Sequence, residues 1–221
     1  PSAPTGGQPR GDGTPSAASA AVDMHRGGMR RHGSYSVGDF EVVVKLGGIS
    51  PDSAGGITYG GGKAFATGRF QGTLSFGSTN ITSAGGTDAY IVAMNPGDGS
   101  LQWAVRAGGN STGDQGNAIA YGGGKVFSTG KFEYVTASFG SGANAKSLPC
   151  AGNNDIYIVA VDPADGSFTW VVKAGGLNSD YGEAITYGGG KVFTTGYFQG
   201  TMSFGNMSLT STGSNDIFIA A

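Results

Sequence analysis

The chain has 221 residues, of which 44 are glycine and only 13% are charged. This composition is typical of a β protein with many tight turns, because glycine adopts turn conformations that other residues avoid. The net charge of −2 argues against a nucleic-acid partner, and no apolar run approaches the roughly 18 residues of a membrane-spanning helix.

Residues 1–35 are predicted to form a flexible tail. Prolines from Pro1 to Pro15 alternate there with glycine, serine and alanine, a composition that buries too little apolar surface to fold. Both histidines, His25 and His32, fall in this tail. We therefore expect residues 36–221 to form the folded domain.

A 15-residue pattern recurs three times in that domain, at residues 56–70, 118–132 and 184–198. Each copy contains Tyr-Gly-Gly-Gly-Lys, followed by a run in which apolar and polar residues alternate. A long repeat built from short strands is typical of a propeller or a solenoid.

Each repeat is predicted to contain four strands, a to d. The recurring pattern supplies strands a and b, and the glycines form the hairpin turn between them. After a short excursion, such as residues 200–204, comes an apolar strand c, such as residues 156–161. An Asp-Gly turn then leads into strand d, as in residues 168–176, and a copy of strand d also precedes the first full repeat at residues 40–48.

Four antiparallel strands per repeat favour a β-propeller over a solenoid, whose repeats are shorter and pair with one another. The blades break near residues 48, 109 and 176, which leaves about three blades' worth of strands. A ring needs about four to eight blades. Three explanations stay open: two chains share a ring with strand d donated in trans, the chain is a fragment of a longer propeller, or a partner caps an open array.

The runs Asp-Tyr-Gly-Glu-Ala-Ile-Thr-Tyr at 180–187, Val-Phe-Thr-Thr-Gly-Tyr-Phe at 192–198 and Asn-Asp-Ile-Phe-Ile at 215–219 resemble the SBBP beta-propeller repeat. Met-Ser-Phe-Gly at 202–205 and Trp-Val-Val-Lys-Ala-Gly-Gly at 170–176 extend the resemblance, which covers residues 39–221. It implies a propeller fold and an extracellular or cell-surface location, and it transfers no catalytic motif.

The folded domain contains no histidine, and its only thiol is Cys150, a predicted loop residue. A Ser-His-Asp or Cys-His site and a typical zinc site are therefore excluded there, although an interchain disulfide is not. Acids recur at equivalent positions in the repeats. We expect them to accept backbone N–H bonds in loops, with a ring of ligand or cation sites, or a catalytic carboxylate pair, as alternatives. They are Asp52, Asp114 and Asp180, and Asp88, Asp155 and Asp216.

Two sets of residues are candidate sites. Trp103 and Trp170 occupy equivalent positions in strand d, where they either form core between blades or stack on a ligand such as a sugar. Asn80, Asn110 and Asn206 begin N-glycosylation sequons in predicted loops.

These observations predict a non-enzymatic β-propeller scaffold that has no cofactor or metal and serves in assembly or adhesion outside the cell. Its partner would be another protein, or another copy bound through a strand edge. The alternative is a carbohydrate-binding propeller with one site per blade.

Overall fold

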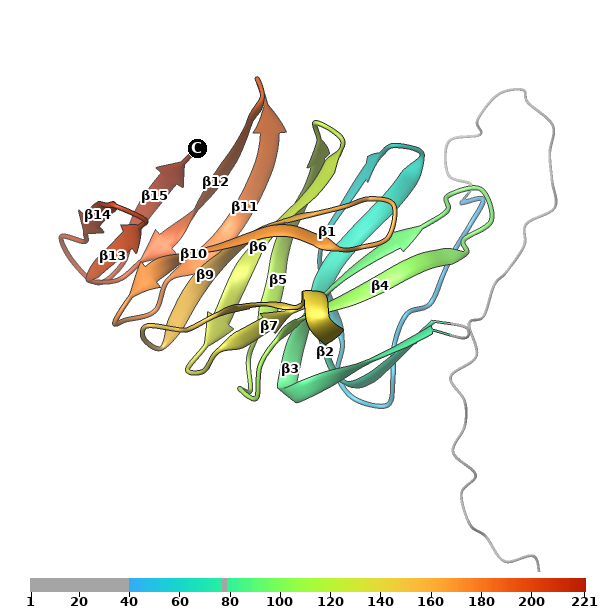
Figure 1. The fold of residues 1–221 in the computed structure, drawn as a ribbon, viewed down its shortest axis with the longest axis horizontal. Coiled ribbons are helices and arrows are strands. Elements are labelled where there is room, and N and C mark those ends of the chain that lie inside the picture. Colours follow the sequence, from blue (N-terminus) through green and yellow to red (C-terminus); the bar gives the residue numbers. More distant parts are fainter. Residues whose placement is uncertain (1–39, 77–78) are drawn as a thin grey trace, which may run out of the picture.

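The computed structural model describes residues 40–76 and 79–221, and the predicted tail of residues 1–35 lies outside the described residues. The described chain is all-β, with antiparallel sheets (Figure 1). Its one helical element is the 3₁₀ turn η1 (Gly142–Asn144). None of the helical structure in these ranges has the length and apolar character needed to cross a bilayer.

Three sheets contain the strands of the three repeats, which we call the first, second and third units. The first unit is β1 (Ser53–Gly60), β2 (Lys63–Phe76), β3 (Thr79–Met94) and β4 (Leu101–Gly108). The second unit is β5 (Gln115–Gly122), β6 (Lys125–Glu133), β9 (Asn154–Val161) and β10 (Phe168–Gly176). The third unit is β11 (Tyr181–Gly188), β12 (Lys191–Phe198) and β15 (Asp216–Ala220).

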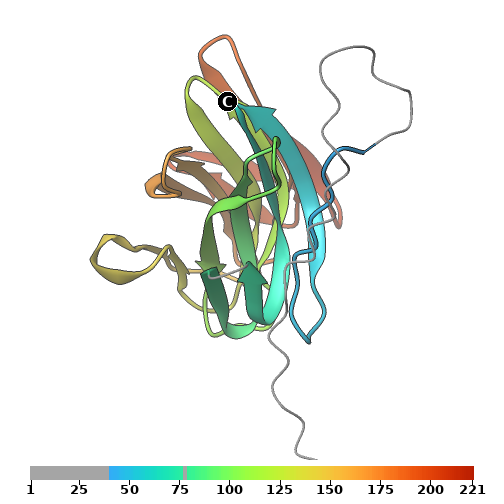
Figure 2. The ribbon, with the colours of Figure 1, turned by 90° about the vertical axis from the view of Figure 1, so that its right-hand side faces the viewer.

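The strands pair as antiparallel meanders in each unit, in the predicted order a-b-c-d in the first two and a-b-c in the third. The sheets are not closed into a ring. Residues 40–52 lie at one end of the array and β15 lies at the other (Figure 1). A view turned by 90° shows the same N-terminal segment running along the outer side of the first unit (Figure 2).

The prediction of a strand at residues 40–48 is wrong for most of that segment. Only Gly47 makes a β-bridge, to Ser75, and residues 40–46 have no strand assignment. A strand needs a neighbouring backbone to satisfy its N–H and C=O groups. In the first two units strand c supplies that neighbour to strand d, and no strand c lies beside residues 40–46 in the described chain.

The excursions between strands b and c connect neighbouring units, which the sequence did not predict. In the second unit the excursion is the hairpin of β7 (Ala137–Phe139) and β8 (Lys146–Leu148), and β7 pairs with β4 of the first unit. In the third it is the hairpin of β13 (Thr201–Phe204) and β14 (Met207–Thr210), and β13 pairs with β10. The bridge between Gly47 and Ser75 is the equivalent contact of the first unit.

The core lies between the units. One cluster joins the first two units through Phe65, Trp103, Val126 and Tyr157, and another joins the second and third through Ile158 and Phe218 together with their neighbours. Every residue of β9 is buried, as predicted for a strand c with neighbours on both faces.

The Gly-Gly-Gly turns have two separate functions. Their second and third glycines, for example Gly123 and Gly124, have positive φ values of 55° and 73°, which a two-residue hairpin turn requires. The first glycine instead makes room for the next unit. A Cβ at Gly122 would lie 2.1 Å from Cδ1 of Tyr187, just as one at Gly60 would lie 1.9 Å from Cδ1 of Tyr121.

Substitution of Gly122 by alanine tests this packing. The added methyl group would overlap the ring of Tyr187, and forced overpacking of this kind costs about 1–3 kcal/mol. We expect the free energy of unfolding, measured by urea titration, to fall by that amount.

Gly188→Ala is the matched control, because no atom lies within 4 Å of its added Cβ. We expect it to change the free energy of unfolding by less than about 1 kcal/mol. Both variants should be measured at a dilution at which the chain sediments as a single copy. Equal losses of stability in the two variants would contradict the packing explanation.

Candidate functional site

The two ends of the array expose side chains whose equivalents are buried between units. On β1, Ile57 is 74% exposed, whereas Ile119 at the same position of the second unit is 7% exposed. At the other end, Ile219 of β15 is 78% exposed, whereas Ile158 of β9 is 6% exposed. We call Ile57 and Tyr59 the leading face. We call the exposed Phe193, Ile217 and Ile219 the trailing face.

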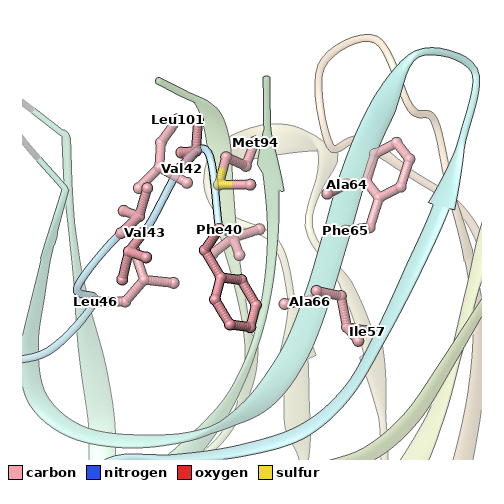
Figure 3. Close-up of a pocket in the computed structure, with 12 residues that line it drawn as sticks. Phe40, Val42, Val43, Leu46, Ile57, Ala64, Phe65, Ala66, Met94 and Leu101 are labelled. Atoms are coloured by element: carbon pink, nitrogen blue, oxygen red, sulfur yellow. The ribbon is translucent and has the colours of Figure 1, made fainter. Parts of the chain in front are cut away.

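An apolar groove of about 470 Å³ lies between residues 40–46 and the first unit (Figure 3). Phe40, Val42 and Leu46 line one side, and Ile57 and Phe65 are among those that line the other. All twelve lining residues are apolar. The groove therefore contains no nucleophile, acid or base, and its chemistry suits an apolar side chain rather than a reaction.

Residues 40–46 lie against the first unit in the way that β4 lies against the second. Val42 and Val44 cover Gly99, where an added Cβ would be 2.6 and 2.7 Å from their methyl groups. Trp103 and Val105 of β4 cover Gly166 at 2.7 and 2.9 Å in the same manner. Residues 40–46 therefore occupy the position of a strand d relative to the following unit. No strand c of the described chain pairs with them.

A buried ion pair joins strands c and d in each of the first two units. Arg106 Nη1 lies 2.7 Å from Asp88 Oδ2, and Lys173 Nζ lies 2.9 Å from Asp155 Oδ2. Both carboxylates are fully buried. Asp216 of the third unit accepts the Thr212 N–H at 2.9 Å, as Asp88 accepts that of Ala84, but it pairs with no cation of the described chain.

The second set of repeated acids caps the backbone at the junctions between units. Asp114 Oδ2 accepts the Gly109 N–H at 2.7 Å, and its Oδ1 accepts the Glu133 N–H at 3.0 Å. Asp180 accepts the equivalent N–H groups of Gly176 and Gln199 at 2.8 and 3.3 Å. The prediction that the repeated acids accept backbone N–H bonds is confirmed. The six bonds to glycine, alanine and threonine N–H groups involve Asp52, Asp88, Asp114, Asp155, Asp180 and Asp216.

The repeated acids lie apart from the apolar groove. Asp88 and Asp114 approach each other around Gly108, but they are 0% and 1% exposed and do not line the groove. Asp155 likewise lies against Gly175, and its charge contributes to raising the pKa of Asp180 as that of Asp88 does for Asp114, so the two units supply similar environments rather than two different carboxyl groups. No cluster of three or more metal-ligating side chains occurs in residues 40–76 and 79–221.

The two candidate tryptophans have different surroundings. Trp103 is 8% exposed, packs 5.8 Å from the ring of Phe65, and donates its indole N–H to the Pro163 carbonyl at 3.1 Å. Trp170 lies 6.0 Å from the ring of Phe127 and is 36% exposed. Of the two positions, Trp170 is the one that presents ring surface to solvent.

The three sequon asparagines are all exposed. Asn110 lies in the bend after β4 and Asn206 in the turn between β13 and β14, as predicted for loops. The loop prediction is wrong for Asn80, which lies in β3 and pairs with Ser75. The alternating Thr and Ser residues of that excursion extend the β2–β3 hairpin into it.

Cys150 is free and half-buried at the edge of the core between the first two units. Burial is the main cause that raises the pKa of its thiol above the ordinary value. The thiol is therefore protonated at neutral pH and a poor nucleophile.

Comparison of the chain with models of known protein families and with curated proteins finds no match. The resemblance to SBBP repeats therefore depends on residues 170–176, 180–187, 192–198, 202–205 and 215–219 alone.

The buried acids predict a specific dependence of stability on pH. Burial raises the pKa of Asp180 above 3.8, against the backbone N–H bonds that lower it. A carboxyl with a raised pKa in the folded state stabilises the fold below its ordinary pKa, and this contribution is lost as the pH rises through the raised value. We expect the difference in free energy of unfolding, wild type minus Asp180→Asn, to fall as the pH rises from 3 towards 7.

Asp165→Asn is the control for that series. The backbone N–H of Ser167 lowers the pKa of this exposed carboxyl, so its contribution is present above 3.8 and is lost as the pH falls. The corresponding difference for Asp165→Asn should therefore rise with pH. Slopes of the same sign for both variants, in urea titrations at each pH, would refute the assignment.

Proposed function

We propose that the chain is a non-enzymatic β-propeller scaffold that assembles with other protein surfaces through its leading and trailing faces. One observation carries this proposal. Ile57 and Ile219 are exposed at the two ends, whereas the equivalent Ile119, Ile91 and Ile158 are buried, and Ile185 is partly buried, where a neighbouring unit is present. Exposed apolar faces of this kind are typical of protein interaction sites.

The propeller interpretation is supported by the way the units stack. Four antiparallel strands form each of the first two units, and β1, β5 and β11 lie side by side along the array. Stacked four-stranded antiparallel sheets are the blades of a propeller. The resemblance to SBBP repeats supports the same fold and a location outside the cell or on its surface.

The non-enzymatic interpretation is supported by the surroundings of the acids. Asp88 and Asp155 are held in ion pairs, and Asp114 and Asp180 accept backbone N–H groups. These side chains have structural partners within the units or at the junctions between them, and the groove contains apolar side chains alone. The leading and trailing faces, in contrast, are exposed and are therefore available to bind a partner.

A carbohydrate-binding function is the second candidate, and the exposed ring of Trp170 favours it. Sugars stack on partly exposed aromatic rings. We expect a glycan array to show no binding that depends on Trp170. Binding by the wild type that disappears in Trp170→Ala, with an unchanged thermal unfolding curve, would replace the scaffold function with this one.

The double variant Ile217→Lys, Ile219→Lys tests the scaffold function. Full burial of one isoleucine side chain contributes about 1.5–3 kcal/mol, so replacing both by lysine should weaken association by at least about a hundredfold. We expect sedimentation velocity across a concentration series to show association of the wild type and single copies of the variant.

Met207→Lys, Leu209→Lys is the matched control, because these two residues are also apolar and exposed but lie on β14, outside the trailing face. It should associate like the wild type. Equal losses of association in the two double variants would indicate general hydrophobic clustering rather than a specific face.

A further inference from the structure

We propose that a second copy of this 221-residue chain pairs with the third unit, with residues 40–46 of that copy lying antiparallel to β15 in the position of a strand d. This inference rests on the proposed scaffold function and specifies both its partner and its register. β15 pairs with β12 on one side and with no strand of the described chain on the other. The open side leaves a row of backbone N–H and C=O groups that a further strand can satisfy.

The two complete units define the register. Tyr90 lies opposite Arg106 and Ile91 opposite Val105 in the first unit. Tyr157 lies opposite Lys173 and Ile158 opposite Val172 in the second. The equivalent residues of the third unit are Phe218 and Ile219, and those of the N-terminal segment are Lys45 and Val44. The second copy therefore places Lys45 opposite Phe218 and Val44 opposite Ile219.

This register supplies the one ion pair that the third unit lacks. Asp88 and Asp155 each pair with the basic residue of strand d, and each also accepts a backbone N–H from the preceding loop. Asp216 already accepts the loop N–H of Thr212 and has no cation partner among residues 40–76 and 79–221. In the second copy, Lys45 occupies the position of Arg106 and Lys173, and its exposed side chain can reach the carboxylate.

The same placement stacks the two exposed faces. The ring of Tyr121 covers Gly60 and stacks 6.0 Å from Phe65, and the ring of Tyr187 covers Gly122 in the same way. Gly188 is the equivalent glycine of the third unit, and no atom lies within 4 Å of the position of its Cβ. Tyr59, at 67% exposure, is the equivalent tyrosine with no glycine to cover. Tyr59 of the second copy fits over Gly188.

The two copies can make this contact twice, because each has both a donor segment and an open β15. Mutual exchange generates a closed pair with two-fold symmetry. Such a pair contains six units, which lies within the roughly four to eight blades of a closed propeller. The mass of the closed pair would be twice 22.0 kDa.

Gly188→Ala and a charge exchange test the inference by sedimentation velocity. Gly188→Ala alters no contact within one copy, yet its methyl group would occupy the place of the partner's ring, so we expect association to be lost.

Lys45→Glu should weaken association by roughly tenfold to a hundredfold, because it places two carboxylates together. Lys45→Glu with Asp216→Lys should restore association. Wild-type association in Gly188→Ala and in Lys45→Glu would overturn the inference.

Disulfide trapping tests the register without dependence on affinity. In a Cys150→Ser background, Val44→Cys protein mixed with Ile219→Cys protein should form a heterodimeric disulfide, since directly opposed residues have Cα atoms within the roughly 4.4–6.8 Å that a disulfide spans. Val43→Cys is the register control and should react more slowly. Equal rates for the two would contradict the proposed pairing.

These results separate the inference from the scaffold function. One outcome is that the Ile217→Lys, Ile219→Lys variant fails to associate while Gly188→Ala and the charge variants behave like the wild type. In that case the faces assemble in another register, and the inference is refuted while the scaffold function stands. A wild type that stays a single copy throughout also overturns the inference. The scaffold function is overturned by its own tests, namely equal losses of association in the two double lysine variants or glycan binding that depends on Trp170.

Discussion

A tyrosine ring of one unit lies against the glycine backbone of the unit before it, and the stacking of the whole array depends on this close approach. An added Cβ at Gly60 or Gly122 would overlap the ring that covers it. Without a side chain at that position, neighbouring sheets approach closely enough for β9 to be buried along its whole length. The high glycine content is therefore a property of the interfaces between units as well as of the turns.

The acids stabilise the array in a different way, both within a unit and at the junctions between units. Burying a carboxylate is costly unless several donors surround it. Asp114 has the N–H groups of Gly109 and Glu133 and the hydroxyl of Ser111, and Asp155 has the ammonium of Lys173 and a loop N–H. The acids at recurring positions in this chain thus link strands to loops by hydrogen bonds and ion pairs. Their recurrence matches the repeated backbone N–H groups that they accept.

The sequence was most informative about features that lie within one repeat. The positions of strands a to c, the positive-φ glycines and the capping acids all follow from local patterns, and the structure has them where they were expected. It was least informative where the neighbour decides the outcome. Residues 40–46 have the apolar character of a strand but lack a partner, and Asn80 was assigned to a loop that the hairpin extends through. No local pattern indicated that the β7 and β13 hairpins would pair with the preceding unit.

The two tryptophans show that exposure in such an array depends on place rather than on residue type. Trp103 and Trp170 occupy equivalent positions, yet one is 8% and the other 36% exposed, because the turn of the following unit covers the first alone. A sugar-binding propeller would present one equivalent site in every unit. In the described chain the exposed features instead differ from unit to unit and lie at the ends, where Lys45 lacks a carboxylate partner and Asp216 lacks a cation. Complementary features at opposite ends are what an end-to-end contact requires, and they favour assembly over a site repeated in every unit.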